Sequence, residues 1–71
     1  MDAAEKGERY ARIFRKAGTL LGKGNIARAV AVFKEGVELA HAQGDAKMAQ
    51  RFQGEIDRAQ ASSGNGENGE N

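Results

Sequence analysis

A stretch that combines glycine and lysine, Leu-Leu-Gly-Lys-Gly-Asn at residues 20–25, is the first candidate for chemistry. A phosphate-binding P-loop has the pattern Gly-x-x-x-x-Gly-Lys-Ser/Thr, in which backbone amides surround the phosphates and the hydroxyl group binds magnesium. Here Ala17 takes the place of the first glycine, Gly24 takes that of the hydroxyl residue, and the preceding pattern is helical. The stretch therefore predicts a turn between two helices, and we expect no cofactor.

Side chains suited to catalysis or metal binding are few. The chain has one histidine and no cysteine, which excludes thiol chemistry and disulfide bonds. Glu35 and Glu38 are expected to lie on a solvated helical face, and His41 falls near a predicted helix end, where the helix dipole favours a cation. We expect no catalytic residues and no metal ligands, so the chain is predicted not to be an enzyme.

Basic residues gather on the first predicted helix. Arg9, Arg12 and Lys16 follow the i, i+3, i+7 spacing that places side chains on one helical face, and Arg15 lies beside them. This stripe is either a solvated face or a contact for an acidic segment of a partner protein. Nucleic acid is a disfavoured partner, because the patch is short and no aromatic residues are interleaved with it for base stacking.

The composition predicts a small all-α domain. Proline and tryptophan are absent, and good helix formers dominate most of the chain. No apolar run approaches the roughly 20 residues of a membrane span, and the N-terminal stretch lacks the hydrophobic segment of a signal peptide, so we expect a cytoplasmic location. The net charge of +1 hides an asymmetry between the two parts of the chain. Residues 1–28 contain seven Lys/Arg and three Asp/Glu, whereas residues 29–71 contain four Lys/Arg and seven Asp/Glu.

Apolar periodicity predicts three helices, at about 3–21, 26–43 and 46–61. The second helix has a further, narrower apolar face formed by Val32 and Leu39, so it is expected to be central. The main apolar stripes are Tyr10, Ile13, Phe14, Ala17, Leu20 and Leu21 in the first helix, Ile26, Ala29, Val30, Phe33, Val37 and Ala40 in the second, and Met48, Ala49, Phe52, Ile56 and Ala59 in the third.

Short turns at 24–25 (Gly-Asn) and 44–45 (Gly-Asp) separate these helices. Glycine adopts the left-handed conformation that ends a helix, and the asparagine or aspartate can cap the next helix with its side chain. Such short connections make the helices antiparallel. We therefore predict a three-helix domain at 1–61, followed by a Gly/Asn/Glu tail at 62–71 that lacks apolar residues and is predicted to be disordered.

The first two predicted helices resemble a tetratricopeptide repeat. The family's alternation of large and small residues, with a Gly-Asn or Gly-Asp turn between two helices, is matched by Ile13, Ala17, Leu20, Gly24, Asn25, Ala29 and Phe33, with Gly36 at the last small position. The resemblance implies a helical hairpin capped by the third helix. It also implies a non-catalytic adaptor that binds a helical or extended segment of a partner protein.

In such a repeat the inner groove is lined by the first helix, here through Ala11, Phe14, Gly18, Leu21 and Gly22. Family members that clamp a C-terminal carboxylate use a lysine and an asparagine where this chain has phenylalanine and glycine, so that clamp is absent. The groove is expected to be apolar, with arginines near its rim. The predicted partner-binding residues are Arg9, Arg12, Phe14, Lys16 and Leu21.

Two alternatives remain open. A Gly-Asn turn, an Ala-x-x-x-aromatic second helix and Arg58-Ala59 near the end of the third helix are similar to microtubule-interacting-and-trafficking (MIT) domains, which implies a trafficking adaptor. A single repeat also buries its faces poorly, which favours a structural subunit that forms a homo-oligomer. In that case Val32 and Leu39 would form an interface if the third helix left them uncovered.

Three glycines fall inside predicted helices, where each costs about 1 kcal/mol relative to alanine. Gly18 and Gly36 indicate either close approach of another helix or simple tolerance on an exposed face. For Gly54 we expect the exposed face.

Overall fold

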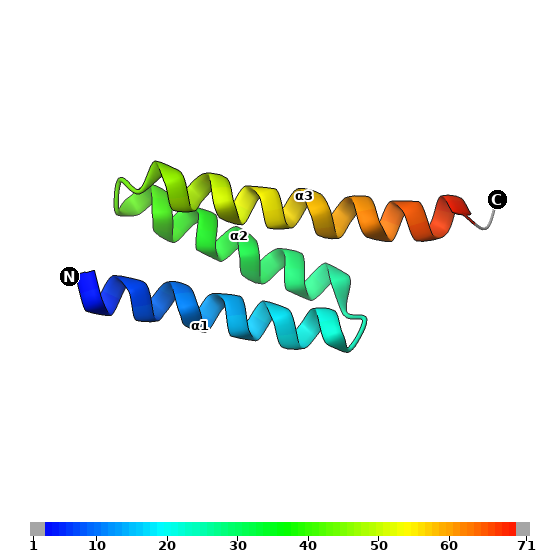
Figure 1. Cartoon of the computed structure of the whole chain (residues 1–71), viewed down its shortest axis with the longest axis horizontal. Coiled ribbons are helices and arrows are strands. Elements are labelled where there is room, and N and C mark those ends of the chain that lie inside the picture. Colours follow the sequence, from blue (N-terminus) through cyan, green and yellow to red (C-terminus); the bar gives the residue numbers. More distant parts are fainter. Residues whose placement is uncertain (1–2, 70–71) are drawn as a thin grey trace.

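Three α-helices make up the described part of the chain. The computed structural model describes the backbone of residues 3–69 and the side chains of residues 7–62. The helices are α1 (Ala3–Gly22), α2 (Ile26–Ala42) and α3 (Ala46–Gly69), and consecutive helices run antiparallel (Figure 1). The predicted all-α fold of three antiparallel helices is confirmed.

The last helix ends later than predicted, at Gly69 instead of near Ala61. Glycine and asparagine are weak helix formers, but the chain has no proline to remove a donor from the helical hydrogen-bond ladder. α3 therefore projects beyond the other two helices (Figure 1). The side chains of 63–71 lie outside the described residues, and the division into a domain and a tail after residue 61 stays a prediction.

Both turns are Schellman motifs, in which two amides beyond the helix end donate back to its last carbonyl groups. At the end of α1, the Gly24 N–H donates to the Leu21 carbonyl (2.9 Å) and the Asn25 N–H donates to the Leu20 carbonyl (2.8 Å). The turn after α2 repeats the pattern around Gly44. The two glycines have φ angles of 78° and 69°, which glycine adopts without a Cβ penalty. The predicted turns are confirmed.

The residues after these glycines begin the next helices in different ways. The Asp45 side chain accepts a hydrogen bond from the Met48 N–H at 3.2 Å, so it caps α3 as predicted. Asn25 makes no side-chain capping bond, and only its carbonyl joins α2, by accepting the Ala29 N–H at 3.1 Å. The predicted side-chain cap at Asn25 was wrong, because its ψ of 71° departs from the extended backbone that aims a capping oxygen at the helix.

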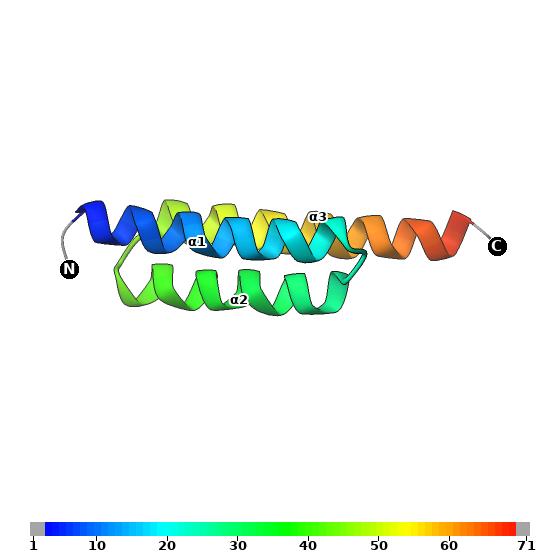
Figure 2. The same cartoon turned by 90° about the horizontal axis from the view of Figure 1, so that it is seen from below.

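The central helix is α2, which contacts both α1 and α3. α1 and α3 lie at one level and α2 packs against them from a second level (Figure 2). Every residue of the three predicted apolar stripes is buried or packs, half-buried, against the core. The periodicity of the sequence therefore identified the core correctly.

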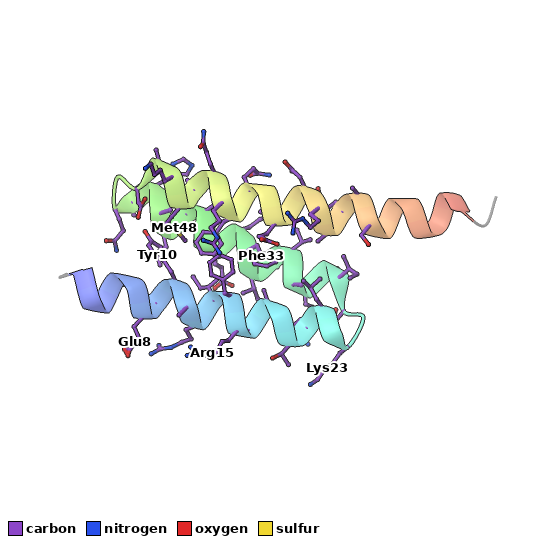
Figure 3. All side chains as sticks on the ribbon, viewed as in Figure 1. Glu8, Tyr10, Arg15, Lys23, Phe33 and Met48 are labelled. Atoms are coloured by element: carbon purple, nitrogen blue, oxygen red, sulfur yellow. The ribbon has the colours of Figure 1, made fainter. Side chains whose placement is uncertain are left out.

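Aromatic side chains join all three helices at one point. Phe52 of α3 is 0% exposed. Its ring stacks on Phe14 of α1 with centroids 4.7 Å apart, and the centroids of Tyr10 and Phe33 lie 5.7 and 6.3 Å away. Figure 3 shows Tyr10 and Phe33 directed into the space between the helices. Such pairs contribute about 0.5–1.5 kcal/mol beyond area burial, so Phe52 links α3 to both other helices.

Gly36 of α2 leaves the space that the Phe52 ring occupies. A Cβ atom at Gly36 would lie 2.8 Å from three carbons of that ring, closer than real contacts allow. A Cβ atom at Gly18 or Gly54 would meet nothing within 4 Å. Close helix approach therefore explains Gly36, whereas Gly18 faces open space and Gly54 lies on an exposed face as predicted.

A hydrogen bond ties α1 to the turn between α2 and α3. The Tyr10 hydroxyl donates to Asp45 Oδ2 at 3.2 Å, while Oδ1 of the same carboxylate caps α3. Tyr10 is buried, and this burial, followed by the hydrogen bond and the negative charge of Asp45, raises the pKa of Tyr10. One carboxylate thus joins the start of α3 to α1.

Replacement of Gly36 by alanine is expected to destabilise the fold. Overpacking against a buried ring costs about 1–3 kcal/mol. Alanine stabilises the helix by about 1 kcal/mol relative to glycine, which offsets part of that cost. We expect a net loss of about 1 kcal/mol in the free energy of unfolding, measured by urea denaturation followed by circular dichroism.

Gly54→Ala and Gly18→Ala are the matched controls, and each should stabilise the fold by up to about 1 kcal/mol. In a Phe52→Leu background, Gly36→Ala should cost less, because the planar ring is gone. Equal stability of the Gly36→Ala and Gly54→Ala proteins would contradict the packing assigned to Gly36.

Tyr10→Phe is expected to cost about 1 kcal/mol at pH 8, because it removes the hydrogen bond to Asp45. Because the pKa of Tyr10 is raised in the folded protein, its hydroxyl ionises at a lower pH in the unfolded chain than in the folded one. The stability that Tyr10 contributes is therefore fully present below about pH 10 and is lost as the pH rises through the folded pKa. Urea denaturation from pH 8 to 11 measures this loss in the free energy of unfolding. The same series on Tyr10→Phe gives the contribution of all other titrating groups, because Tyr10 is the only tyrosine. Parallel stability profiles for the two proteins would refute the assignment.

Candidate functional site

Two adjoining hollows lie between α1 and α2. The first has a volume of about 490 Å³ and is lined by Lys16, Thr19, Leu20, Arg28, Ala31, Val32 and Glu35. The second has a volume of about 210 Å³ and is lined by Arg9, Arg12, Ile13, Glu35 and Leu39. Because Glu35 lines both hollows, we treat them as one surface feature, the α1/α2 groove.

The floor of the α1/α2 groove has two apolar layers. Ile13 and Leu39 line one hollow, and Leu20 and Val32 line the other. Within each helix the two residues are seven positions apart, so the layers are separated by about 10 Å at a rise of 1.5 Å per residue. Val32 is buried and the other three are half-buried. A third helix with apolar residues seven apart matches this spacing.

Val32 and Leu39 form the narrower apolar face predicted for the second helix. Their hollows are lined by residues of α1 and α2, and α3 contributes no lining residue. α3 instead lines a hollow together with Val37 and His41 of α2. Val32 is 6% exposed and Leu39 is half-buried, so this face reaches the groove only in part, and its use as an interface stays a prediction.

The predicted basic stripe forms one wall of the groove. Arg9 and Arg12 line one hollow and Lys16 lines the other. All three side chains are exposed, as is Arg15, which does not line either hollow. Figure 3 shows Arg15 on the edge of α1 that faces away from α3. The structure thus brings three of the predicted partner-binding residues together.

Phe14 and Leu21, the other two predicted partner-binding residues, lie apart from this groove. Phe14 is half-buried between elements of the core: its ring stacks on Phe52, and the guanidinium carbon of Arg51 lies 5.0 Å from its centroid. Leu21 is also half-buried and packs against the core. Their contact with a partner stays a prediction, and the α1/α2 groove does not include them.

The opposite wall, formed by Arg28 and Glu35, was not identified from the sequence. Each of these residues precedes an apolar floor residue by four positions, since Arg28 precedes Val32 and Glu35 precedes Leu39. A spacing of four places neighbours on one helical face, so this signal was present in the sequence. It could be recognised only once α3 was known to leave that face open.

The turn at residues 23–25 is not shaped to hold a phosphate. The N–H groups of Lys23, Gly24 and Asn25 all donate to carbonyl groups of the last turn of α1. They are therefore not directed outward as the amides of a P-loop are. The predicted helix-to-helix turn is the structure found.

The remaining titratable side chains form no further candidate site among the described residues. His41 is exposed near the end of α2 and lines a further hollow of about 340 Å³ between α2 and α3. Within the described residues, no group of three His, Asp or Glu side chains is arranged to hold a metal ion. No helix in the described range is both long and apolar enough to cross a membrane.

Comparisons of this chain with protein-family models, with curated proteins and with solved structures found no match.

Proposed function

We propose that this chain is a non-catalytic protein-interaction module that binds an amphipathic α-helix of a partner protein in the α1/α2 groove. The observation that carries the proposal is the pair of apolar layers, Ile13 with Leu39 and Leu20 with Val32, at the spacing of a heptad. Helix-in-groove recognition uses such repeated apolar anchors. The groove offers them on two antiparallel helices with charged walls on either side.

The resemblance to a tetratricopeptide repeat supports an adaptor role. The small positions on which the resemblance rests are closely packed, since Ala17 and Ala29 are 0% exposed and Gly36 is covered by Phe52. Small residues at these positions let neighbouring helices approach closely. The adaptor proposed here uses the groove between its first two helices, at a different place from the inner groove that the resemblance implies.

A homo-oligomeric structural subunit is the second candidate, and the same apolar layers favour it. Two copies related by a two-fold axis could place their α1/α2 grooves face to face and form a four-helix bundle. The two candidates differ in a simple observable, because the second predicts that the mass of the free chain depends on concentration. Sedimentation equilibrium of the full chain separates them.

Substitution of Ala31 by glutamate is expected to weaken helix binding at least tenfold. Ala31 is exposed and lines the groove, so a glutamate there puts a longer, charged side chain under the apolar face of the ligand. The probes are designed peptides of three heptads with leucines seven residues apart. Binding is measured by NMR titration of the labelled chain, and shift changes are expected at Ile13, Leu20, Val32 and Leu39.

Ala61→Glu provides the matched control, because Ala61 is exposed on α3 and lines neither groove hollow. It should leave the affinity unchanged, and circular dichroism should show both variants to be folded. Peptide-induced shifts located away from the groove, or absent, would contradict the proposed function. A free chain that is dimeric through the groove would assign it to the structural subunit instead.

A further inference from the structure

The two walls of the α1/α2 groove differ in charge. Arg9, Arg12 and Lys16 on α1 are all basic, whereas Arg28 and Glu35 on α2 balance each other. Arg12 and Lys16 are exposed and form no ion pair with another side chain described at residues 7–62. The α1 wall of the groove is therefore positively charged, whereas the charges of the α2 wall cancel.

A helix that lies on an apolar floor presents one edge to each wall. Acidic residues on the edge that faces α1 would approach Arg12 and Lys16, while acidic residues on the other edge would approach Glu35. Opposite charges attract, and like charges repel with a similar magnitude at the same distance. Arg12 and Lys16 are four residues apart, so they match acidic residues spaced three or four apart on a ligand helix.

We propose that the occupant of the groove is an amphipathic helix of a partner protein with its acidic residues concentrated on one edge, and that the positive α1 wall determines the direction in which this helix runs. This inference rests on the proposed function. Turning a helix end for end on the same floor exchanges the edges that face the two walls. The direction of the ligand helix is therefore coupled to the edge that carries its acidic residues. Only one of the two directions places the acidic edge against α1.

The groove is less suited to nucleic acid than to such a helix. Glu35 lines both hollows and would repel a phosphate backbone on the α2 side of the groove. The floor between the walls is aliphatic, with Ile13, Leu20 and Leu39 half-buried, and it offers no aromatic surface for base stacking. An acidic helix satisfies both the apolar floor and the positive wall.

The test uses two peptides of identical composition on the full chain. Both have leucines seven residues apart and a nitroxide label at the N-terminus. One carries glutamates on one edge and lysines on the other, and the second carries them exchanged. We expect both to bind in the groove but in opposite directions, so one broadens the NMR signals around Gly24 and the other those around Gly44.

Removal of the positive wall should abolish this directional preference. In the double variant Arg12→Gln/Lys16→Gln, each peptide should broaden signals at both ends of the groove, and its affinity should fall by about three- to tenfold at low salt. The matched control is Arg15→Gln/Lys23→Gln, which removes the same charge from exposed residues that line neither groove hollow. It should leave direction unchanged and affinity nearly so.

The possible failures are distinguishable. Binding of both peptides in one direction, or equal behaviour of the two double variants, would overturn the directional inference and leave the helix-binding function in place. Absence of any peptide from the groove would overturn both. Displacement of the peptides by a duplex oligonucleotide of equal concentration would assign the positive wall to nucleic acid.

Discussion

The rest of this small structure depends on one contact, in which the Phe52 ring packs against Gly36. The ring is fully buried and meets aromatic side chains of both other helices. A chain of 71 residues buries a modest fraction of its surface, so one shared ring carries a large part of the cohesion among its helices. A glycine inside a helix is unfavourable by itself, and here it permits a contact that a methyl group would prevent.

The packing of the helices also leaves a groove between α1 and α2. The rings of Tyr10 and Phe14 on α1 contact the Phe52 ring of α3, and α3 lines a hollow with Val37 and His41 of α2. α3 lines neither groove hollow, so the groove is bordered by α1 and α2 and has an aliphatic floor. The proposed binding surface is thus a consequence of how the core is packed.

The turns contribute in a different way, since each ends one helix and begins the next within a few residues. Gly24 and Gly44 adopt the same left-handed conformation and the same hydrogen bonds, but the residues that follow them act differently. Asp45 caps α3 with one carboxylate oxygen and accepts the Tyr10 hydroxyl with the other. Asn25 contributes only its backbone. The second turn is consequently tied to α1, which aligns the three helices at that end of the domain.

Local features of the sequence were sufficient to predict the number of helices, the bounds of α1 and α2 to within a residue, the glycine turns and the apolar stripes, because these depend on spacings of a few residues and on the conformational freedom of glycine. The basic stripe was predictable for the same reason. The end of α3 and the side-chain cap at Asn25 were predicted wrongly. The tertiary structure alone decided that Gly36 receives a side chain and Gly18 does not, that Phe14 does not line the groove, and that Arg28 and Glu35 form a wall of it. These outcomes depend on how side chains of different helices interlock, and residues far apart in the sequence meet only after the helices have packed.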